Sequence, residues 1–327
     1  MLNLAYIGTG PISDFHLPVL KKAGFNISSI SSQKNSKNIQ KFAQKFNIKN
    51  IISDWHELLN IIDSYDAIML AVKTDVTFEI LNHLIELDKP ILVEKPVSIK
   101  SKEIIKLIQR NNKKVFVAYN RRYYASTAWA KNFIESKSNV SATFFIPEIH
   151  HLNFYHNSAH IIDLMNYFFK DLHLDYANNF ITDKKLSGLT AIFKTKRGDV
   201  INLISNWNAP SNFKIEIIHQ DEKMELFPIE KAYFYKGMRI IEPTTEDPIR
   251  KYVPKLIMKS KEGKMEENFK PGFYKQASVF YNYVKYNQYD ERMCTLKQSK
   301  DAIEIIEKLL PTSGRLFTRQ IFYTQDP

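Results

Sequence analysis

The first 120 residues alternate short apolar runs with longer stretches in which apolar side chains recur every three or four positions. After Lys100, for example, Ile104, Ile105 and Ile108 would share one face of a helix. Such alternation is typical of βαβ units that build a parallel sheet. The apolar runs predict six strands, at Leu2–Ile7, Phe25–Ser31, Ile48–Ser53, Ala67–Val72, Pro90–Glu94 and Val115–Tyr119. The stretches between them predict helices at Ile12–Ala23, Ser36–Phe46, Thr77–Leu87 and Ser101–Asn111.

The pattern changes after Asn120, where helices are expected only at Ala128–Ser136 and Ala159–Phe169 before a run of strands. Polar and turn-forming residues over 244–272 predict a long surface excursion. The sequence therefore predicts an α/β protein with an N-terminal Rossmann domain, residues 1–119, and a C-terminal α+β domain, residues 120–327, with a large, mostly antiparallel open sheet. Further elements expected in the second domain are strands at Leu189–Lys194, Val200–Trp207, Phe213–His219 and Lys223–Phe227, helices at Tyr274–Tyr286 and Leu296–Leu310, and an apolar tail at Leu316–Tyr323.

Composition and charge exclude several classes of protein. Apolar residues make up 44% and charged residues 25% of the chain, a balance that favours a folded, soluble protein over a disordered one. No apolar stretch approaches the roughly 18 residues of a membrane span, and no signal peptide is evident. The single cysteine, Cys294, fits a reducing compartment, so we expect a cytoplasmic protein. The net charge of +11 comes from scattered lysines without interleaved aromatic residues, which argues against nucleic acid and favours anionic small molecules as partners.

A glycine-rich turn links the first predicted strand to the first predicted helix. Gly8 permits a tight turn, and Gly10 lets the backbone approach a pyrophosphate, which would lie at the positive end of the helix. Pro11 suits the first helical turn because its missing N–H would have no partner there, and Ile12 follows it. Ser13 replaces the third glycine of the usual dinucleotide-binding fingerprint. The alternative is a glycine turn of some other α/β fold.

The end of the second predicted strand bears on the choice between NAD and NADP. NAD-binding folds usually carry an acidic residue there, which binds the ribose hydroxyls. This chain has Ser32 and Lys34 at that place, and no acid between positions 15 and 53. A hydroxyl and a lysine would bind a 2′-phosphate that a carboxylate would repel, so NADP is favoured over NAD. The alternative is that Lys34 and Lys37 are solvated residues at a helix start.

Several short motifs together resemble the Gfo/Idh/MocA oxidoreductase family, over nearly the whole chain. A Glu-Lys-Pro sequence closes the fifth predicted strand at a characteristic distance from the N-terminal glycine turn. The matching segments are the glycine turn itself, His16-Leu17-Pro18, Glu94-Lys95-Pro96, Asn120-Arg121-Arg122, and Phe273 and Gln276 in a closing helix.

The resemblance implies a nicotinamide dinucleotide across the carboxyl ends of the strands and an open C-terminal sheet that often mediates a homo-oligomer, either a dimer or a tetramer. It also implies that Lys95 projects into the active site, with Glu94 and Lys95 beside the cofactor and an unusual peptide geometry before Pro96. The position of Lys95 at the carboxyl end of a predicted strand supports this, because ligands of open α/β sheets bind at the carboxyl ends of strands. Without the resemblance, the alternative for Lys95 is a surface lysine before a proline turn.

The family's second signature, Asp-x-Gly-x-His-x-x-Asp at the start of a helix, corresponds to residues 156–163. His160 and Asp163 match it, whereas His156 stands at the first aspartate and Ser158 at the glycine. A histidine can replace that aspartate in hydrogen bonding or proton transfer only with a different charge and geometry.

On one continuous α-helix, His156, His160 and Asp163 would share a face, which also suits a metal ion. The spacing resembles that of zinc helices, but Asn157 stands where their general base would be a glutamate. Paired histidines are more often packed or catalytic, so we expect no metal.

Reduction of a carbonyl needs positive charge and a proton near the developing alkoxide. We expect Lys95 to stabilise this oxygen and His160 to exchange the proton, because an ordinary histidine pKa of about 6.5 lies near working pH. His156 is a further catalytic candidate. The residues expected beside the substrate, each with a structural role as the alternative, are Tyr119, Asn120, Arg122, Tyr155 and Asp163.

These features predict an NAD(P)-dependent dehydrogenase or reductase that acts by hydride transfer on a sugar, a sugar derivative or a nucleotide-linked ketosugar. The carbohydrate class follows from the resemblance, because a fold does not fix a substrate. Two alternatives stay open: a catalytically degenerate sensor that binds dinucleotide or sugar, and an enzyme that uses the cofactor transiently in hydrolysis or epimerisation. The presence of both Lys95 and His160 argues against a sensor, which needs no proton relay.

Overall fold

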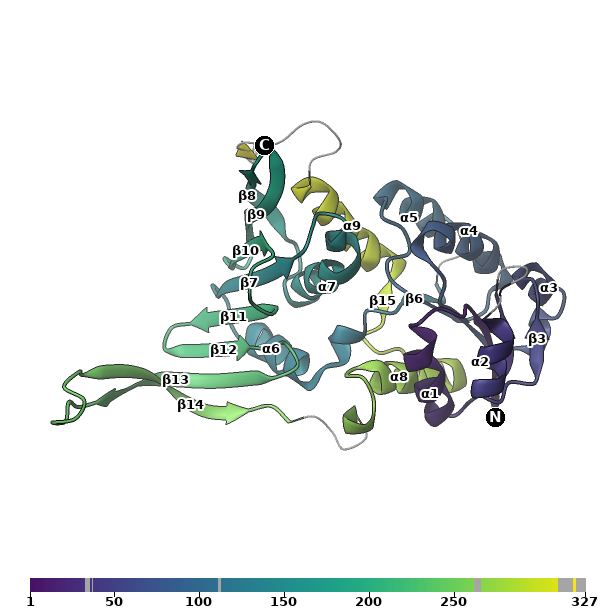
Figure 1. Cartoon of the computed structure of the whole chain (residues 1–327), viewed down its shortest axis with the longest axis horizontal. Coiled ribbons are helices and arrows are strands. Elements are labelled where there is room, and N and C mark those ends of the chain that lie inside the picture. Colours follow the sequence, from purple (N-terminus) through teal and green to yellow (C-terminus); the bar gives the residue numbers. More distant parts are fainter. Residues whose placement is uncertain (33–35, 37, 111–112, 262–265, 311–319, 322–327) are drawn as a thin grey trace. The chain divides into compact units, whose positions relative to one another are not determined.

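The described residues form two compact units (Figure 1). Unit 1 combines Met1–Tyr123 with Gly263–Ile306, and unit 2 combines Tyr124–Glu262 with Glu307–Pro327. The predicted domain ranges, 1–119 and 120–327, stay a prediction, although packing places most of the C-terminal segment with the first unit. The computed structural model describes the whole chain except residues 33–35, 37, 111–112, 262–265, 311–319 and 322–327.

Unit 1 contains a seven-stranded sheet in the order β15-β6-β5-β4-β1-β2-β3 (Figure 1). Its neighbouring strands pair in parallel, apart from β15, which pairs antiparallel with β6. The six strands predicted from the sequence are confirmed, four of them with shorter ends. Their bounds are β1 Leu2–Ile7, β2 Phe25–Ser31, β3 Asn50–Ile52, β4 Ala67–Leu70, β5 Ile91–Val93 and β6 Val115–Val117, and the added strand is β15 Cys294–Thr295.

The helices predicted in this part of the chain are also confirmed. Helix α4 continues directly into the 3₁₀ turn η2. The structure adds a short helix, α3, after β3 and further 3₁₀ turns that the sequence did not predict. The bounds are α1 Ser13–Ala23, α2 Ile39–Lys45, α3 Trp55–Leu59, η1 Ile62–Ser64, α4 Thr74–Leu84, η2 Ile85–Leu87, α5 Ser101–Ile108, η3 Asn120–Tyr123, η5 Glu266–Asn268, α8 Phe273–Tyr286 and α9 Leu296–Leu309.

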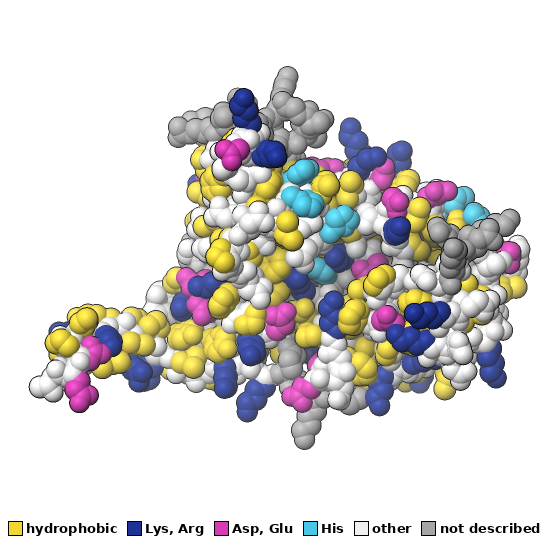
Figure 2. Space-filling model, viewed as in Figure 1, with side chains coloured by type: hydrophobic (Ala, Val, Ile, Leu, Met, Phe, Trp, Pro, Cys, Tyr) yellow, Lys and Arg dark blue, Asp and Glu magenta, His cyan; other side chains and the backbone are white. Residues whose placement is uncertain are grey.

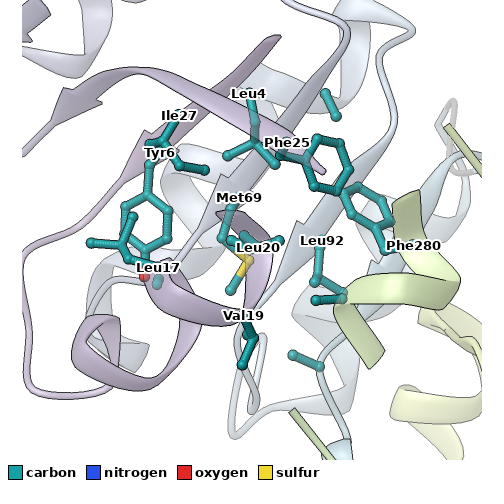
Figure 3. Close-up of a cluster of buried hydrophobic side chains, with 14 of the residues drawn as sticks. Leu4, Tyr6, Leu17, Val19, Leu20, Phe25, Ile27, Met69, Leu92 and Phe280 are labelled. Atoms are coloured by element: carbon teal, nitrogen blue, oxygen red, sulfur yellow. The ribbon is translucent and has the colours of Figure 1, made fainter. Parts of the chain in front are cut away.

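One hydrophobic core in unit 1 joins the start of the chain to its C-terminal part. Leu17 and Leu20 of α1 and Phe25 of β2 are buried together with Phe280 of α8 (Figure 3). The rings of Phe25 and Phe280 lie 5.7 Å apart. Because full burial of a Leu or Phe side chain contributes about 1.5–3 kcal/mol, this contact holds α8 firmly to the sheet that carries the glycine turn.

Unit 2 contains a nine-stranded sheet in the order β14-β13-β12-β11-β7-β10-β9-β8-β16. Strands β7 and β10 pair in parallel and the other described pairs are antiparallel, which confirms the mostly antiparallel sheet. The four predicted strands correspond to β9, β10, β11 and β12. The bounds are β7 Ser141–Glu148, β8 His173–Thr182, β9 Lys185–Lys194, β10 Val200–Trp207, β11 Lys214–His219, β12 Glu222–Leu226, β13 Ala232–Ile241, β14 Lys251–Lys259 and β16 Gln320–Ile321.

One sequence expectation for this unit needs correction in part. Residues 244–272 were expected to form a turn-rich surface excursion, and Lys251–Lys259 within them is largely exposed but forms strand β14, which pairs with β13 at the edge of the sheet. Within the predicted apolar tail, Gln320–Ile321 pairs with β8, and the rest of Leu316–Tyr323 lies outside the described residues.

The helices of unit 2 carry the second sequence signature. Helix α6 (Ala125–Glu135) packs against β12 and β13, and α7 (Ala159–Phe168) packs against β7. A π-helical turn, η4 (Phe154–Ser158), precedes α7 directly. In the part of the chain that the structure describes, no helix is long and apolar enough to cross a membrane.

Candidate active site

The turn after β1 has a backbone that requires glycine at its first position. Gly8 has a φ angle of 126°, and a Cβ there would lie 2.0 Å from the carbonyl oxygen of Ala71. The N–H of Gly8 donates to the carbonyl oxygen of Ser31 at 2.8 Å. A Cβ at Gly10 would instead meet nothing within 4 Å. Ser13 is buried, and its hydroxyl donates to the carbonyl oxygen of Gly8 at 3.5 Å, so the residue at the third glycine position stabilises the turn.

A pocket of about 630 Å³ opens beside this turn within unit 1. Its walls are the glycine turn, the end of β2, the residues after β4 and the first turns of α4. Its size is within the range of small-molecule and cofactor sites. The open space at Gly10 and the N-terminal end of α1 suit a pyrophosphate, so the residues present fit a dinucleotide. Predicted cofactor residues that line it together are Gly8, Gly10, Pro11, Ile12 and Ser32.

The same pocket contains polar residues that the sequence analysis did not single out. Lys73, Asp75 and Glu79 line it, the last two one helical turn apart on α4. Strand order could have indicated them, because β4 lies next to β1 and the chain after β4 must therefore reach the glycine turn. Lys34, which was predicted to bind a 2′-phosphate, lies outside the described residues.

Glu94 is held by two neighbours just after β5. His16 Nε2 lies 2.5 Å from one carboxylate oxygen, and the backbone N–H of Lys95 donates to the other at 3.0 Å. Burial opposes ionisation of this carboxyl, but the contact with His16 and the charge of Lys95 outweigh burial and hold the pKa of Glu94 below its ordinary value. Glu94 thus fixes the backbone of Lys95, and neither residue is among those that line the described pocket.

Lys95 lies at the carboxyl end of β5 and is partly buried. Its peptide bond to Pro96 is cis, which confirms the unusual geometry expected from the resemblance. Strand β5 is adjacent to β4 and β6, and all three end on the same edge of the sheet as the strand before Gly8. Lys95 therefore lies on the edge where ligands of open α/β sheets bind.

Three residues predicted beside the substrate are buried within unit 1. The exposed fractions are 1% for Tyr119, 6% for Asn120 and 1% for Arg122. The Asn120 amide donates to the carbonyl oxygen of Pro271 at 2.9 Å, and the Arg122 guanidinium donates to Gln298 Oε1 at 3.1 Å. These bonds tie the segment after β6 to the C-terminal part of unit 1, and a role in substrate binding stays a prediction.

In unit 2 the second signature spans two kinds of helix. A continuous α-helix over 156–163 was the condition for a shared face, and this condition is not met, because η4 is π-helical and α7 begins at Ala159. The i→i+5 bonds of a π-helix change the rotation per residue, so His156 does not keep α-helical spacing to His160. His160 and Asp163 are buried, whereas His156 is exposed.

Tyr155 precedes His156 in the same π-helical turn and is partly buried. Burial and, to a lesser extent, the charge of Glu307 raise the pKa of Tyr155 above its ordinary value. Its hydroxyl therefore stays protonated at neutral pH and is able to donate a hydrogen bond.

A buried carboxylate that sequence reasoning missed lies beside this signature. Glu148, at the end of β7, accepts hydrogen bonds from the hydroxyl of Ser158 and, at 3.3 Å, from the backbone N–H of Ile149. Both Glu148 and Ser158 are buried. The serine at the family's glycine position thus has a structural use, which no local sequence pattern indicates.

Charged side chains of both signs are spread over the surface of the described chain. On the face shown in Figure 2, Lys and Arg side chains are interspersed with Asp and Glu. Within the described residues, no three or more His, Cys, Asp and Glu side chains gather in a way that could hold a metal ion.

Comparison with known proteins identifies the fold of both units. A search of curated proteins found no match. Solved structures similar to this chain include a dehydrogenase from Clostridium difficile, with 18% identity, a TM-score of 0.73, and coverage of 94% of this chain and 98% of that chain. A UDP-N-acetylglucosamine 3-dehydrogenase from Acidithiobacillus ferrooxidans has 14% identity, a TM-score of 0.72, and coverage of 94% and 96%. A levoglucosan dehydrogenase, solved with NADH and levoglucosan, has 14% identity, a TM-score of 0.71, and coverage of 94% and 96%.

Residues 2–119 match the model of the Gfo/Idh/MocA family, an oxidoreductase family with an NAD-binding Rossmann fold. This match covers the glycine turn, the pocket beside it and the Glu94-Lys95-Pro96 segment described above. Residues 2–119 are thus similar to the NAD-binding domain of the Gfo/Idh/MocA oxidoreductases, and the solved structures share the fold of nearly the whole chain.

Proposed function

We propose that this protein is an NAD(P)-dependent oxidoreductase that transfers hydride to or from a sugar, a sugar derivative or a nucleotide-linked ketosugar. The observation that carries the proposal is the glycine turn, in which Gly8 is obligatory and the space beside Gly10 is open to a pocket of about 630 Å³. An N-terminal helix end at this place favours a pyrophosphate.

For the cofactor, the proposal favours NADP over NAD. Ser32 lines the pocket where NAD-binding folds place a carboxylate, and the sequence around it contains lysines and no acid. Asp75 and Glu79 line the pocket from α4, and their carboxylates would repel a 2′-phosphate. The proposal expects NADPH to bind more tightly than NADH, and Asp75→Asn to tighten NADPH binding further because it removes one of these negative charges.

The chain's own residues would manage the charge and proton at the reacting oxygen. When bound, the nicotinamide ring supplies or accepts the hydride. In the proposal, the Lys95 ammonium stabilises negative charge on the substrate oxygen, while His160 gives that oxygen its proton in reduction and removes it in oxidation. Glu94 positions Lys95 through its backbone N–H. His156 is retained as a second proton-transfer candidate.

The carbohydrate class is supported by two of the structural relatives, which act on levoglucosan and on UDP-N-acetylglucosamine. Hydroxyl, amide and carboxylate groups suit a polyhydroxylated substrate, and in unit 2 the hydroxyl of Tyr155 and the carboxylate of Asp163 are proposed to supply some of them. Tyr119, Asn120 and Arg122 are proposed at the same site, with Asn120 and Arg122 held by hydrogen bonds within unit 1. We also propose a homo-oligomer, and the cytoplasmic location stays a prediction.

The test is to measure binding of NADPH and of NADH to the purified protein by the fluorescence of the reduced nicotinamide. Gly10→Trp serves as the variant in which the site is blocked. Binding that is lost in Gly10→Trp supports the dinucleotide site. A screen of keto- and hydroxysugars with Lys95→Ala and His160→Ala then tests turnover, each variant being expected to lose at least 100-fold in kcat. Failure of both cofactors to bind would overturn the proposal.

A second candidate is a sensor that binds dinucleotide or sugar without turnover. It is favoured by one observation, the exposed His156 in place of the signature's aspartate. Tight NADPH binding with no absorbance change at 340 nm, roughly the wavelength at which reduced nicotinamides absorb, across the whole sugar screen would select it. Product analysis by NMR would distinguish transient use of the cofactor in hydrolysis or epimerisation.

A further inference from the structure

Unit 2 contains a pocket of about 560 Å³ that the proposed chemistry does not use. It lies at the end of the sheet where β7 and β10 finish and β9 begins, and these three strands lie next to one another in the sheet. Its volume falls within the range of small-molecule sites. The lining residues are Ile149, His150, His151, Lys185, Leu186, Ser187, Trp207, Asn208 and Leu310.

One wall of this pocket, which we call the sheet-end pocket, is formed by the indole of Trp207. The ring of His151 lies near it, with centroids 6.2 Å apart and planes inclined by 37°. Trp207 is partly exposed, although its Nε1 is buried. The apolar surface of the indole suits a ligand with a C–H face, as a sugar ring has.

The polar groups that remain free to bind at the sheet-end pocket are mainly donors. Nδ1 of His150 accepts a backbone N–H at 3.2 Å, which leaves Nε2–H as a donor in the neutral ring. The hydroxyl of Ser187 is already satisfied, since it both donates and accepts within the β8–β9 hairpin. Lys185 adds an ammonium group, for which the described chain offers no ion-pair partner. A ligand that complements these groups must therefore be rich in acceptors.

The charge of the lining points to an anion. Lys185, His150 and His151 line the pocket, and none of the nine lining residues is acidic. The carboxylate next in sequence, Glu148, is already bound to Ser158 and to the backbone at the end of β7. A lysine and two imidazoles without a compensating carboxylate attract and hold an oxyanion.

We propose that the sheet-end pocket binds a sugar that carries an oxyanion, with the sugar ring on Trp207 and the oxyanion at Lys185 and His150. The inference rests on the proposed function and narrows its substrate class to anionic sugars, whether sugar phosphates, sugar acids or nucleotide-diphosphate sugars. The chain that leaves β7 through His150 and His151 continues directly into the turn that carries His156 and into α7, which carries His160. His150, one of the two anchors proposed for the substrate's charged end, is thus on the same stretch of chain as the proposed proton-transfer residues.

Tryptophan fluorescence provides a direct test, because the chain has three tryptophans. In the full-length Trp55→Phe/Trp129→Phe variant, the emission reports on Trp207 alone. We would titrate it with glucose, glucose 1-phosphate, glucuronate, UDP-glucose and inorganic phosphate, without any dinucleotide. The expected result is quenching by one or more of the anionic sugars, at concentrations at least tenfold below those needed for glucose or inorganic phosphate.

Calorimetry on variants of the full chain then locates the binding site. Lys185→Gln is expected to weaken binding of the tightest anionic sugar at least tenfold, and Trp207→Phe at least threefold. Lys196→Gln is the matched control, because Lys196 is an exposed lysine just beyond the other end of β9. The affinity of this variant for the sugar should not change. Both substituted pocket side chains are accessible enough at the surface for the variants to fold.

Three outcomes would overturn the inference: glucose and the anionic sugars binding equally, inorganic phosphate binding as tightly as the sugars, or Lys185→Gln behaving like Lys196→Gln. The relative affinities of glucose 1-phosphate, glucuronate and UDP-glucose identify which source of the oxyanion the pocket prefers. If none of these sugars binds as expected but NADPH still binds, only the inference about the sheet-end pocket is overturned. Loss of NADPH binding with intact sugar binding would instead overturn the proposed function.

Discussion

Gly8 and Gly10 lie two residues apart, yet a side chain would have opposite effects at the two positions. Gly8→Ala places Cβ against the carbonyl oxygen of Ala71 at a φ of 126°, so it should lower the free energy of unfolding by more than about 2 kcal/mol. Gly10→Ala meets open space, so stability should change by less than about 0.5 kcal/mol while NADPH binding weakens at least tenfold. Urea unfolding and cofactor fluorescence measure the two effects. Equal losses of stability would contradict this interpretation of the turn.

The contact of Glu94 with His16 predicts a pH effect on stability. The folded state holds the pKa of Glu94 below its ordinary value, so the carboxylate stabilises the fold above the unfolded pKa of about 4.3. This contribution is lost as the pH falls through the folded pKa. Glu94→Gln should lower the free energy of unfolding by about 1–3 kcal/mol at pH 7 and make its dependence on pH flatter below about pH 4.

Urea unfolding of both proteins between pH 3 and pH 7 would show the difference in slope. Glu267→Gln is the control, because Glu267 is exposed and its substitution should leave the slope unchanged. Parallel curves for Glu94→Gln and the unsubstituted protein would exclude a stabilising role for the buried carboxylate.

At this scale, the sequence predicts contacts within a short segment but not contacts between distant ones. The positions of Gly8, Gly10 and Pro11 indicated the turn because the required backbone is local. Glu94 and His16 are 78 residues apart in sequence, and only the pairing of β1, β4 and β5 brings α1 to the end of β5. The bond between Glu148 and Ser158 spans only ten residues and was missed for another reason, since the π-helical turn η4 was not foreseen.

Strand β7 and the π-helical turn η4 are joined by a buried hydrogen bond, which gives a prediction about these elements. Ser158→Ala removes the donor to Glu148 and leaves a buried carboxylate short of one partner, so the unfolding free energy should fall by about 1–3 kcal/mol. Ser141→Ala, at the exposed start of β7, should have an effect within about 0.5 kcal/mol. Thermal unfolding of the two variants checks this, and similar melting temperatures would show that the bond contributes nothing.

Several elements with a clear hydrophobic period were predicted well, although β7, which alternates between buried and less buried positions, was not predicted. Helix α5 and strand β10 have apolar residues at the spacing of their structure, and both were placed close to their observed bounds. Strand β14 is solvated along nearly all of its length, so its residues do not alternate between buried and exposed, and the segment was taken as part of a turn-rich surface excursion. The π-helical η4 has no recognised sequence period at all.

The hairpin of β13 and β14 gives a prediction for the assembled protein. It exposes Met238, Ile240, Tyr252, Leu256 and Met258 by about half their area or more, and Figure 2 shows hydrophobic side chains gathered on it. Apolar patches of this kind usually mark contact surfaces. The proposed homo-oligomer should therefore dissociate when the hairpin is made polar.

Light scattering after size exclusion would measure the mass of the unsubstituted protein and of Ile240→Lys/Leu256→Lys. A dimer or tetramer is expected for the former and a monomer for the latter. Ile218→Lys, on β11, is the control, since Ile218 is exposed singly and away from this hairpin. A monomeric unsubstituted protein would overturn the oligomer prediction.

Unit 1 is completed by a segment that comes late in the chain, and this order matters while the protein is being made. Residues up to Tyr123 leave the ribosome first, but α8, which covers Leu20 and Phe25, follows only after the whole of Tyr124–Glu262. At about 5–20 residues per second, that delay is roughly 7–30 s. For this time, the apolar surface that Phe280 will cover is open to chaperones and to other nascent chains. Slow codons within the unit 2 coding sequence would therefore lower the yield of folded protein without changing a single amino acid.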